Sequence, residues 1–252
     1  MSNPLISIVT VSYNAASTIE QTILSVLNQT YPNIEYIIID GGSTDGTLEI
    51  IKKYAHKLSY WVSEPDEGIY DAMNKGIAHA QGDLVGIINS DDWYEDIIEK
   101  VVSSYQKRPE PECLFHGNIR FYSSNSFIVS KPCLNLAQLY RGTILFHPTL
   151  FVPRKVYDRI GGFQPHYRIA ADYDFILRCY QANYRFVYLN EVIANMRTDG
   201  ESNTHQLEGY QEVLQIALKA GLPRYKVYRS FIYKYIIGST VRLKKKLEML
   251  KK

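Results

Sequence analysis

The chain has 252 residues, of which 46% are hydrophobic and 21% charged, a globular composition that excludes a disordered chain. Its three cysteines are widely spaced, so we expect neither a disulfide framework nor a cysteine zinc site, and we expect a reducing cytoplasm. No apolar run approaches the roughly 18 residues of a membrane span, and the N-terminus lacks a signal-peptide pattern, so we expect no export.

Charge is unevenly distributed around a net value of +2. Residues 224–252 contain ten Lys and Arg and one acid, whereas the rest of the chain contains 18 basic and 25 acidic residues. A basic tail of this kind typically meets a polyanion or an anionic membrane surface. Apolar residues alternate with the basic ones in the tail, which favours an interfacial helix. The alternative is a packing helix with a solvated basic end.

The first ninety residues alternate strand and helix patterns. Apolar runs, the first of them largely β-branched, predict strands at 6–11, 35–40, 58–63 and 83–88. A helix is predicted to begin after Ser17 as its N-cap and to stop at 31–33, because its apolar residues Ile19, Ile23, Val26 and Leu27 fall on one helical face. Further helices are expected at 47–54 and 69–80. This order predicts an α/β fold with a mainly parallel, Rossmann-like sheet flanked by helices on both faces.

The pattern changes from residue 110, where short strands mix with loops. We expect strands at 114–121, 127–130, 150–153 and 184–191, and helices at 94–105 and 171–182. Residues 205–250 are predicted to be helical with a break at 221–223. The chain is therefore expected to comprise one α/β domain, residues 1–204, and a helical, basic tail, residues 205–252.

Acidic residues follow two predicted strands, at the edge where ligands bind in such sheets. Asn89-Ser90-Asp91-Asp92 ends the strand at 83–88, and its adjacent carboxylates repel each other unless a cation neutralises them. Oxygen ligands suit Mg²⁺ or Mn²⁺. Alternatively, one of the two acids caps the helix predicted at 94–105.

Asp40 ends another strand and opens the glycine-rich loop 41–46. Such a loop lets the backbone approach a ligand closely, although it also suits a plain turn that leads into a helix. The chain has neither a GxGxxG after its first strand nor a phosphate-binding P-loop, so a dinucleotide fold is poorly supported. Asp172, which opens a predicted helix, is in isolation more typical of a cap or dipole partner than of a catalytic acid.

Together these segments resemble glycosyltransferase family 2, whose members have the GT-A fold and use nucleotide sugars with inversion. The matching segments are 8–14, 39–47, 89–92, 161–163 and 171–172. Two positions depart from the family pattern, since Asn89 replaces the first acid of its DxD motif and Ala171 replaces a Glu. The resemblance covers about residues 4–200, and 63–76 is similar to the bacterial branch that builds surface polysaccharides.

The resemblance implies a role for each matching residue. Asp91 is expected to bind Mn²⁺ or Mg²⁺, Asp172 to act as the general base, and Asp40 to contact the nucleoside. Thr10, Tyr13 and Asn14 are expected to border the base and ribose, and Asp66 and Lys75 to lie near the diphosphate or donor sugar. The other residues expected to bind the nucleotide sugar are Gly42, Ser43, Asn89, Ser90 and Asp92.

The resemblance also implies partners and a location. We expect an inverting, hexosyltransferase-type enzyme that takes a UDP-sugar and a saccharide or lipid-linked acceptor, binds no nucleic acid, and works in the cytoplasm, peripherally on the inner face of the membrane. Two alternatives stay open. A degenerate carbohydrate-binding scaffold would explain Asn89 and Ala171. A sugar-nucleotide pyrophosphorylase would need a phosphate loop after the first strand, where this chain has 12–16 instead.

Overall fold

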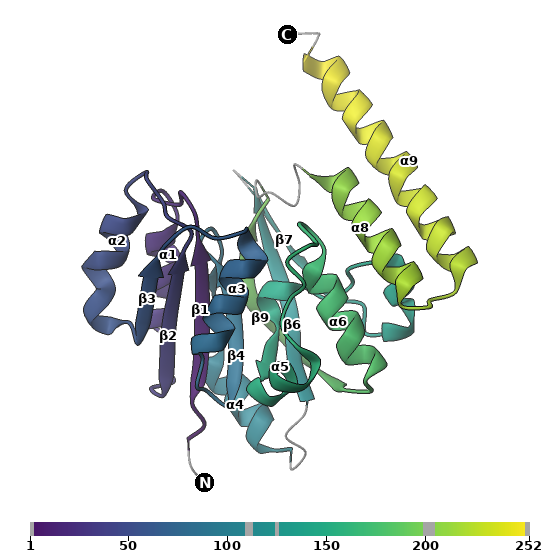
Figure 1. Ribbon diagram of the computed structural model, residues 1–252. Coiled ribbons are helices and arrows are strands. Elements are labelled where there is room, and N and C mark those ends of the chain that lie inside the picture. The colour runs from purple at the N-terminus through teal and green to yellow at the C-terminus, as the bar shows by residue number, and fades with distance from the viewer. Residues whose placement is uncertain (1–2, 109–112, 124–125, 199–204, 250–252) are drawn as a thin grey trace.

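The computed structural model describes residues 3–108, 113–123, 126–198 and 205–249, with side chains to residue 236. Within those ranges a nine-stranded sheet runs in the order β3-β2-β1-β4-β8-β6-β9-β5, with β7 paired to β6 (Figure 1). The strands are β1 (Ile6–Ser12), β2 (Ile34–Asp40), β3 (Tyr60–Ser63), β4 (Leu84–Asn89), β5 (Trp93–Tyr94), β6 (Cys113–Ser123), β7 (Ser126–Ser130), β8 (Phe151–Pro153) and β9 (Arg185–Arg197).

The N-terminal half of the sheet is parallel. Strands β3, β2, β1 and β4 run side by side, and their register brings their carboxyl ends to one edge. Asp40 pairs with Ser12 on one side and with Ser63 on the other, and Asn89 pairs with Val11. The polar residues that end these strands therefore meet at one place.

The C-terminal half of the sheet is mixed. Strand β8 is antiparallel to β4 and β6, whereas β9 is parallel to β6 and antiparallel to β5. The expected α/β architecture is thus confirmed, with parallel pairing concentrated in the first ninety residues.

Helices cover both faces of the sheet because successive strand residues point to opposite sides. On one face Ile6, Ile8 and Ile38 pack against α1 (Ile19–Leu27), α2 (Thr47–Tyr54) and α4 (Ile98–Gln106). On the other face Val9 and Ile37 pack against α3 (Ile69–His79), α5 (Arg154–Ile160) and α6 (Ala171–Gln181). Short 3₁₀ turns occupy 55–57, 136–141 and 147–149.

Several predicted boundaries were wrong. Thr18, not Ser17, occupies the N-cap position of α1. The helix predicted from residue 94 begins at Ile98, because Trp93 and Tyr94 pair with β9 as strand β5. Asp91 and Asp92 therefore do not cap that helix. Helix α5 was not predicted, and β9 extends to Arg197 rather than 191.

The C-terminal part is helical, as predicted, with the break between α8 (Gln206–Lys219) and α9 (Arg224–Met249). Ile216 and Ala217 of α8 and Val227 of α9 belong to the core on the α3 side of the sheet. Helix α9 runs beside α8, and its C-terminal end projects away from the body (Figure 1). Across the described residues, no helix is long and apolar enough to cross a bilayer.

Candidate active site

Asp40 is the centre of the edge where β1, β2 and β3 end. Its carboxylate is fully buried and accepts hydrogen bonds from the hydroxyls of Ser12 (2.8 Å), Ser43 (2.6 Å) and Ser63 (2.7 Å), and from the Ser43 amide (2.9 Å). Both oxygens are thus occupied within the protein. Asp40 holds three strand ends and the glycine-rich loop in place, and this shapes the surface that a ligand would meet.

The loop after β1 is fastened to the loop after β2. The Asn14 amide donates to Ser43 Oγ at 2.7 Å, and Asn14 Oδ1 accepts from the Thr44 amide at 2.9 Å. Asn14 and Gly42 both have positive φ, at 47° and 80°, which the tight fit of the two loops requires. Tyr13 is left 66% exposed beside them, so its ring is free to stack on a planar ligand.

Thr10 does not belong to this surface, contrary to expectation. Its side chain is fully buried, and its hydroxyl lies 3.0 Å from the hydroxyl of Tyr36. Thr10 is separated by two and four residues from Ile8 and Ile6, so all three point to the α1 face of the sheet.

The loop between β3 and α3 adds Asp66 to the surface around Tyr13. A Cβ on Gly41 would lie 2.5 Å from Asp66 Oδ2 and 3.4 Å from the Tyr13 ring. Both side chains therefore pack directly over the Gly41 backbone. The other carboxylate oxygen of Asp66 accepts from the Gly68 amide at 2.9 Å.

Lys75 supports the same loop from α3. Its ammonium group lies 3.1 Å from Glu64 and 3.3 Å from Asp71, and it donates to the Pro65 carbonyl at 3.2 Å. The hydrogen bond to Glu64 is the main cause that raises the pKa of Lys75. Lys75 therefore stabilises the loop that carries Asp66. Its ion pair with Asp71 is the i,i+4 pair that the helical spacing allows.

The turn after β4 holds oxygen atoms that lack partners. Asn89 Oδ1 and Asp92 Oδ2 are buried without a hydrogen-bond partner among the described residues. Ser90 locks the turn in place, since its amide donates to the Val11 carbonyl and its carbonyl accepts from Thr22. Buried polar atoms are normally satisfied, so the two orphan oxygens call for a bound donor or cation.

Burial raises the pKa of Asp91, and burial together with the Asp91 charge raises that of Asp92 well above its usual range. A divalent cation would relieve both effects. In the described ranges, no three His, Cys, Asp or Glu side chains gather in a metal-binding arrangement. The carboxylate and amide oxygens of Asp91, Asp92 and Asn89 are nevertheless ligand types that suit Mg²⁺ or Mn²⁺, which use few protein ligands and complete their shell with phosphate and water.

Arg197, at the end of β9, was not predicted as a site residue. Its guanidinium donates to the carbonyl of Asp91 and, at 2.6 Å, to Gln21, and it lies 4.8 Å from the centre of the Trp93 ring. Its amide donates to Asp92 Oδ1 at 3.2 Å. Arg197 therefore fixes the acidic turn from the end of strand β9, more than a hundred residues later in the sequence.

Asp172 lies in the first turn of α6, on the α3 side of the sheet. Its Oδ1 accepts from the Tyr173 amide at 2.7 Å and from the Tyr70 hydroxyl at 3.4 Å. The side chain is half-buried, and desolvation is the main cause that raises the pKa of Asp172 to about 6. A carboxyl with this pKa, partly open to solvent, has the properties of a general base near neutral pH.

Residues 161–163, the Gly-Gly-Phe segment before α6, are also held in place by α3. Asn74 donates to the Phe163 carbonyl and accepts from the Phe163 amide, both at 2.8 Å. The β3–α3 connection therefore adjoins Tyr13 and Gly41 at one end and Asp172 at the other, and it links the two halves of the predicted site.

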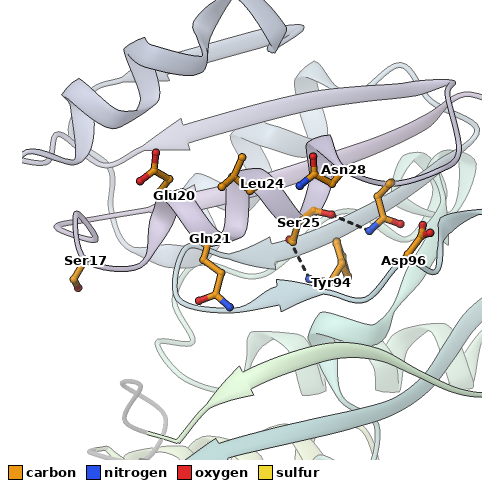
Figure 2. Close-up of a pocket in the computed structure, with 9 residues that line it drawn as sticks. Ser17, Glu20, Gln21, Leu24, Ser25, Asn28, Tyr94 and Asp96 are labelled. Atoms are coloured by element: carbon orange, nitrogen blue, oxygen red, sulfur yellow. Dashed lines mark hydrogen bonds between the residues drawn. The ribbon is translucent and has the colours of Figure 1, made fainter.

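A hollow of about 620 Å³ lies elsewhere, along α1 and beside β5 (Figure 2). Its lining includes Ser17, Glu20, Leu24 and Asp96, and it contains none of the predicted site residues. Gln21, which accepts from Arg197, is its link to the acidic turn. No function is assigned to it.

The chain is similar to known glycosyltransferases in sequence and in fold. The family model for Glycosyl transferase family 2 matches residues 7–152. A glycosyltransferase of Mycobacterium tuberculosis is 36% identical over 182 residues, which cover 70% of this chain and 69% of the relative.

Two solved structures share the fold. TarS 1–349 of S. aureus in complex with UDP-GlcNAc has a TM-score of 0.68 at 19% identity, and the match covers 90% of this chain and 70% of the TarS chain. The mannosyltransferase PcManGT of Pyrobaculum calidifontis, in complex with GDP-Man and Mn²⁺, has a TM-score of 0.66 at 20% identity, and the match covers 92% of this chain and 70% of the PcManGT chain. At these identities the likeness shows the fold alone, which is the expected GT-A fold.

Proposed function

The chain belongs to glycosyltransferase family 2, and on that premise we propose that it transfers a hexosyl group from a nucleotide sugar to an acceptor hydroxyl with inversion and with the help of a divalent cation. The proposal rests on the turn after β4, at the ligand-binding edge of the sheet, where Asn89 and Asp92 each bury a side-chain oxygen without a partner among the described residues and Asp91 stands between them in the sequence.

Asn89, Asp91 and Asp92 would hold Mn²⁺ or Mg²⁺ through their side-chain oxygens. When bound, the cation supplies positive charge that stabilises the diphosphate leaving group. Arg197 would keep the turn rigid for this purpose, since its guanidinium binds Gln21 and the Asp91 carbonyl and its amide binds the Asp92 carboxylate.

The donor would lie across the loops after β1 and β2. Tyr13 offers an exposed ring for the nucleobase, whereas Asp40 shapes the floor from below, with Asn14, Gly42 and Ser43 beside it. Asp66 lies at the rim next to Tyr13, where its carboxylate can accept a hydrogen bond from a base or sugar hydroxyl.

Asp172 would act as the general base. An acceptor hydroxyl attacks the anomeric carbon on the face opposite the diphosphate, its proton passes to the Asp172 carboxylate, and the bond from that carbon to the diphosphate oxygen breaks. A single displacement inverts the anomeric centre. Because the pKa of Asp172 is raised to about 6, the group is both ionised at pH 7 and basic enough to help.

The class of substrate rests on resemblance. TarS was solved with UDP-GlcNAc and PcManGT with GDP-Man, so both nucleotides are candidates, with UDP first. We propose a saccharide or lipid-linked acceptor in bacterial surface-polysaccharide synthesis. We also keep, as a proposal, the division into a catalytic domain at 1–204 and a basic helical tail at 205–252.

Helix α9 supports a peripheral location on an anionic membrane. Tyr225, Tyr228, Ile232 and Ile236 recur at helical spacing and are each 45–70% exposed, so they form an apolar stripe on the face of α9 that is open to solvent. Arg229 is exposed near the stripe, and further Lys and Arg follow in 242–252. Each basic residue near anionic lipid contributes about 1 kcal/mol.

The test of sugar transfer is ligand-dependent stability followed by turnover. UDP-GlcNAc or GDP-mannose with Mn²⁺ should raise the melting temperature of the wild type, since ligand at 100 times its Kd adds about 2.7 kcal/mol of stability. Asp91→Ala should lose the Mn²⁺-dependent part of the shift. Binding without any nucleotide release, even with lipid extract as acceptor, would favour the degenerate scaffold that Asn89 and Ala171 suggest.

The membrane test is co-sedimentation with vesicles of phosphatidylglycerol or of phosphatidylcholine alone. Wild-type protein should pellet with the anionic vesicles at low salt and less at high salt. A Tyr228→Ser, Ile232→Ser variant should lose binding, whereas the control Ile128→Ser, on exposed strand β7, should not. Equal binding to both lipids would contradict the docking proposal.

A further inference from the structure

We propose that Glu212, on helix α8, is a positioning residue for the base Asp172. The inference rests on the proposed function and extends the catalytic site into the C-terminal helices.

The carboxylate of Glu212 binds three consecutive backbone amides. Its Oε1 accepts from the Arg168 amide at 2.7 Å, and its Oε2 accepts from the amides of Ile169 at 2.9 Å and Ala170 at 2.8 Å. Hydrogen bonds to an ionised acceptor are about twice as strong as neutral ones. One side chain thus holds the whole segment that leads into α6.

This segment needs an external partner. Ala170 occupies the N-cap position of α6, and its methyl group cannot accept a hydrogen bond. Glu212, from another helix, instead binds the amides of the three residues that end at this N-cap, and it places negative charge near the N-terminus of α6, where the helix dipole favours it. Asp172 lies two residues after the last amide that Glu212 binds.

The opposite side of the segment is held by α3. The Tyr70 hydroxyl donates to the Ile169 carbonyl at 2.8 Å and lies 3.4 Å from Asp172 Oδ1. The backbone at Ile169 is therefore held through its amide by Glu212 and through its carbonyl by Tyr70. These two hydrogen bonds fix the backbone before α6 and so the orientation of the Asp172 side chain.

The close approach of α8 is built into its sequence. Gly209 lies one helical turn before Glu212 on the same face, and a Cβ there would lie 3.0 Å from Ile169 Cγ2. The absent side chain lets α8 come near enough for the Glu212 carboxylate to reach the amides.

Positioning matters here because a general base must meet the acceptor hydroxyl within hydrogen-bond distance. A misplacement of about 1 Å lowers turnover on the order of 10²-fold. Among the described residues, Tyr70 and Glu212 are the titratable side chains on neighbouring elements that act on Asp172. The Glu212 charge contributes to the raised pKa of Asp172, and the Tyr70 hydrogen bond opposes it.

The test uses the full chain with Mn²⁺ and UDP-GlcNAc or GDP-mannose, whichever the wild type turns over, and compares Glu212→Gln with Glu212→Ala. We expect kcat to fall about 10- to 100-fold in Glu212→Ala and less in Glu212→Gln, which keeps one acceptor oxygen. The Kd for the free nucleotide should stay within about twofold, and the acid limb of kcat against pH should move to lower pH.

Glu208→Gln is the matched control. Glu208 lies on the same helix, one turn earlier, and its carboxylate lies 4.0 Å from the Arg168 side chain and 3.3 Å from His205. Its replacement should leave kcat and the pH profile at wild-type values. Hydrogen exchange at 168–172 should accelerate in Glu212→Ala and not in Glu208→Gln.

Wild-type kcat in folded Glu212→Ala, or a loss no larger than its unfolded fraction, would overturn the positioning role. So would unchanged exchange at 168–172 in both Glu212 variants. Asp172→Asn run in parallel separates the two claims: if Asp172→Asn keeps full turnover, the proposed base is wrong. If Asp172→Asn is inactive while Glu212→Ala is normal, only the inference about Glu212 fails.

Discussion

The hydroxyl of Tyr70 lies 3.4 Å from the carboxylate of Asp172 and also donates to the Ile169 carbonyl at 2.8 Å, so α3 and α6 meet at the proposed base. Tyr70 belongs to the first turn of α3, directly after the loop that carries Asp66. One connection between β3 and α3 therefore touches both the donor loops and the base.

Tyr70→Phe should raise the pKa of Asp172, so that a smaller fraction of the proposed base is ionised at a given pH. The Tyr70 hydrogen bond lowers the pKa of Asp172, so its loss should raise that pKa above about 6 and move the acid limb of kcat to higher pH. The lost bond is worth about 1 kcal/mol, so turnover at pH 6 should fall severalfold. A pH series of kcat measures this shift. Movement of the limb to lower pH would contradict the assigned hydrogen bond.

Asp172→Asn should be more stable than the wild type above pH 6. The folded-state pKa of about 6 exceeds the ordinary 3.8, so protonation of Asp172 stabilises the fold fully below about pH 4, and this stabilisation is lost as the pH rises through 6. The amide that replaces the carboxyl in the variant does not titrate. The stability difference should therefore grow between pH 4 and pH 7 by up to about 3 kcal/mol.

Urea unfolding at several pH values measures this difference. A difference between Asp172→Asn and wild type that stays flat from pH 4 to pH 7 would show that the Asp172 pKa is not raised.

Gly41→Ala should weaken nucleotide binding without unfolding the protein. The new Cβ would lie 2.5 Å from Asp66 Oδ2, and the end of a flexible side chain can move aside. Asp66 and Tyr13 would both shift, so the Kd for UDP with Mn²⁺ should rise by about tenfold, which is about 1.4 kcal/mol. Calorimetric titration gives the Kd, and an unchanged value with a normal melting temperature would place the nucleotide elsewhere.

Asn89→Asp should tighten metal binding. A third carboxylate would join Asp91 and Asp92 where an orphan amide oxygen now lies, and carboxylates are the stronger ligands for Mn²⁺. The variant should be less stable than the wild type without metal, because the added charge is buried among like charges. Electron paramagnetic resonance titration with Mn²⁺ measures the affinity. Equal Mn²⁺ affinity in Asn89→Asp and wild type would argue that position 89 is not a ligand.

The strand ends of the first ninety residues were predictable because each is marked by a local pattern. Asp40, Asp91 and the glycine-rich loop follow apolar runs, and parallel strands bring such ends to one edge. The alternation of β1 would also have placed Thr10 in the core with Ile8, although the resemblance suggested otherwise.

The contacts that fix the proposed site were not predictable in the same way. Arg197 reaches Asp91 across 106 residues, Tyr70 reaches Asp172 across 102, and Glu212 reaches Ala170 across 42. Such pairs depend on how β9, α3 and α8 pack, and single-sequence periodicity carries no information on that packing. Strand β5 escaped prediction because two residues are too few to show a period.

Asp172 is the proposed base of a metal-assisted sugar transfer. The most direct test is the rate of nucleotide release by the wild type and by Asp172→Asn, each saturated with Mn²⁺ and with the sugar nucleotide that stabilises the wild type most. We predict a rate lower by roughly 10²- to 10⁴-fold in Asp172→Asn, the share of a general base, with the nucleotide Kd unchanged. Equal rates in the two proteins would contradict it.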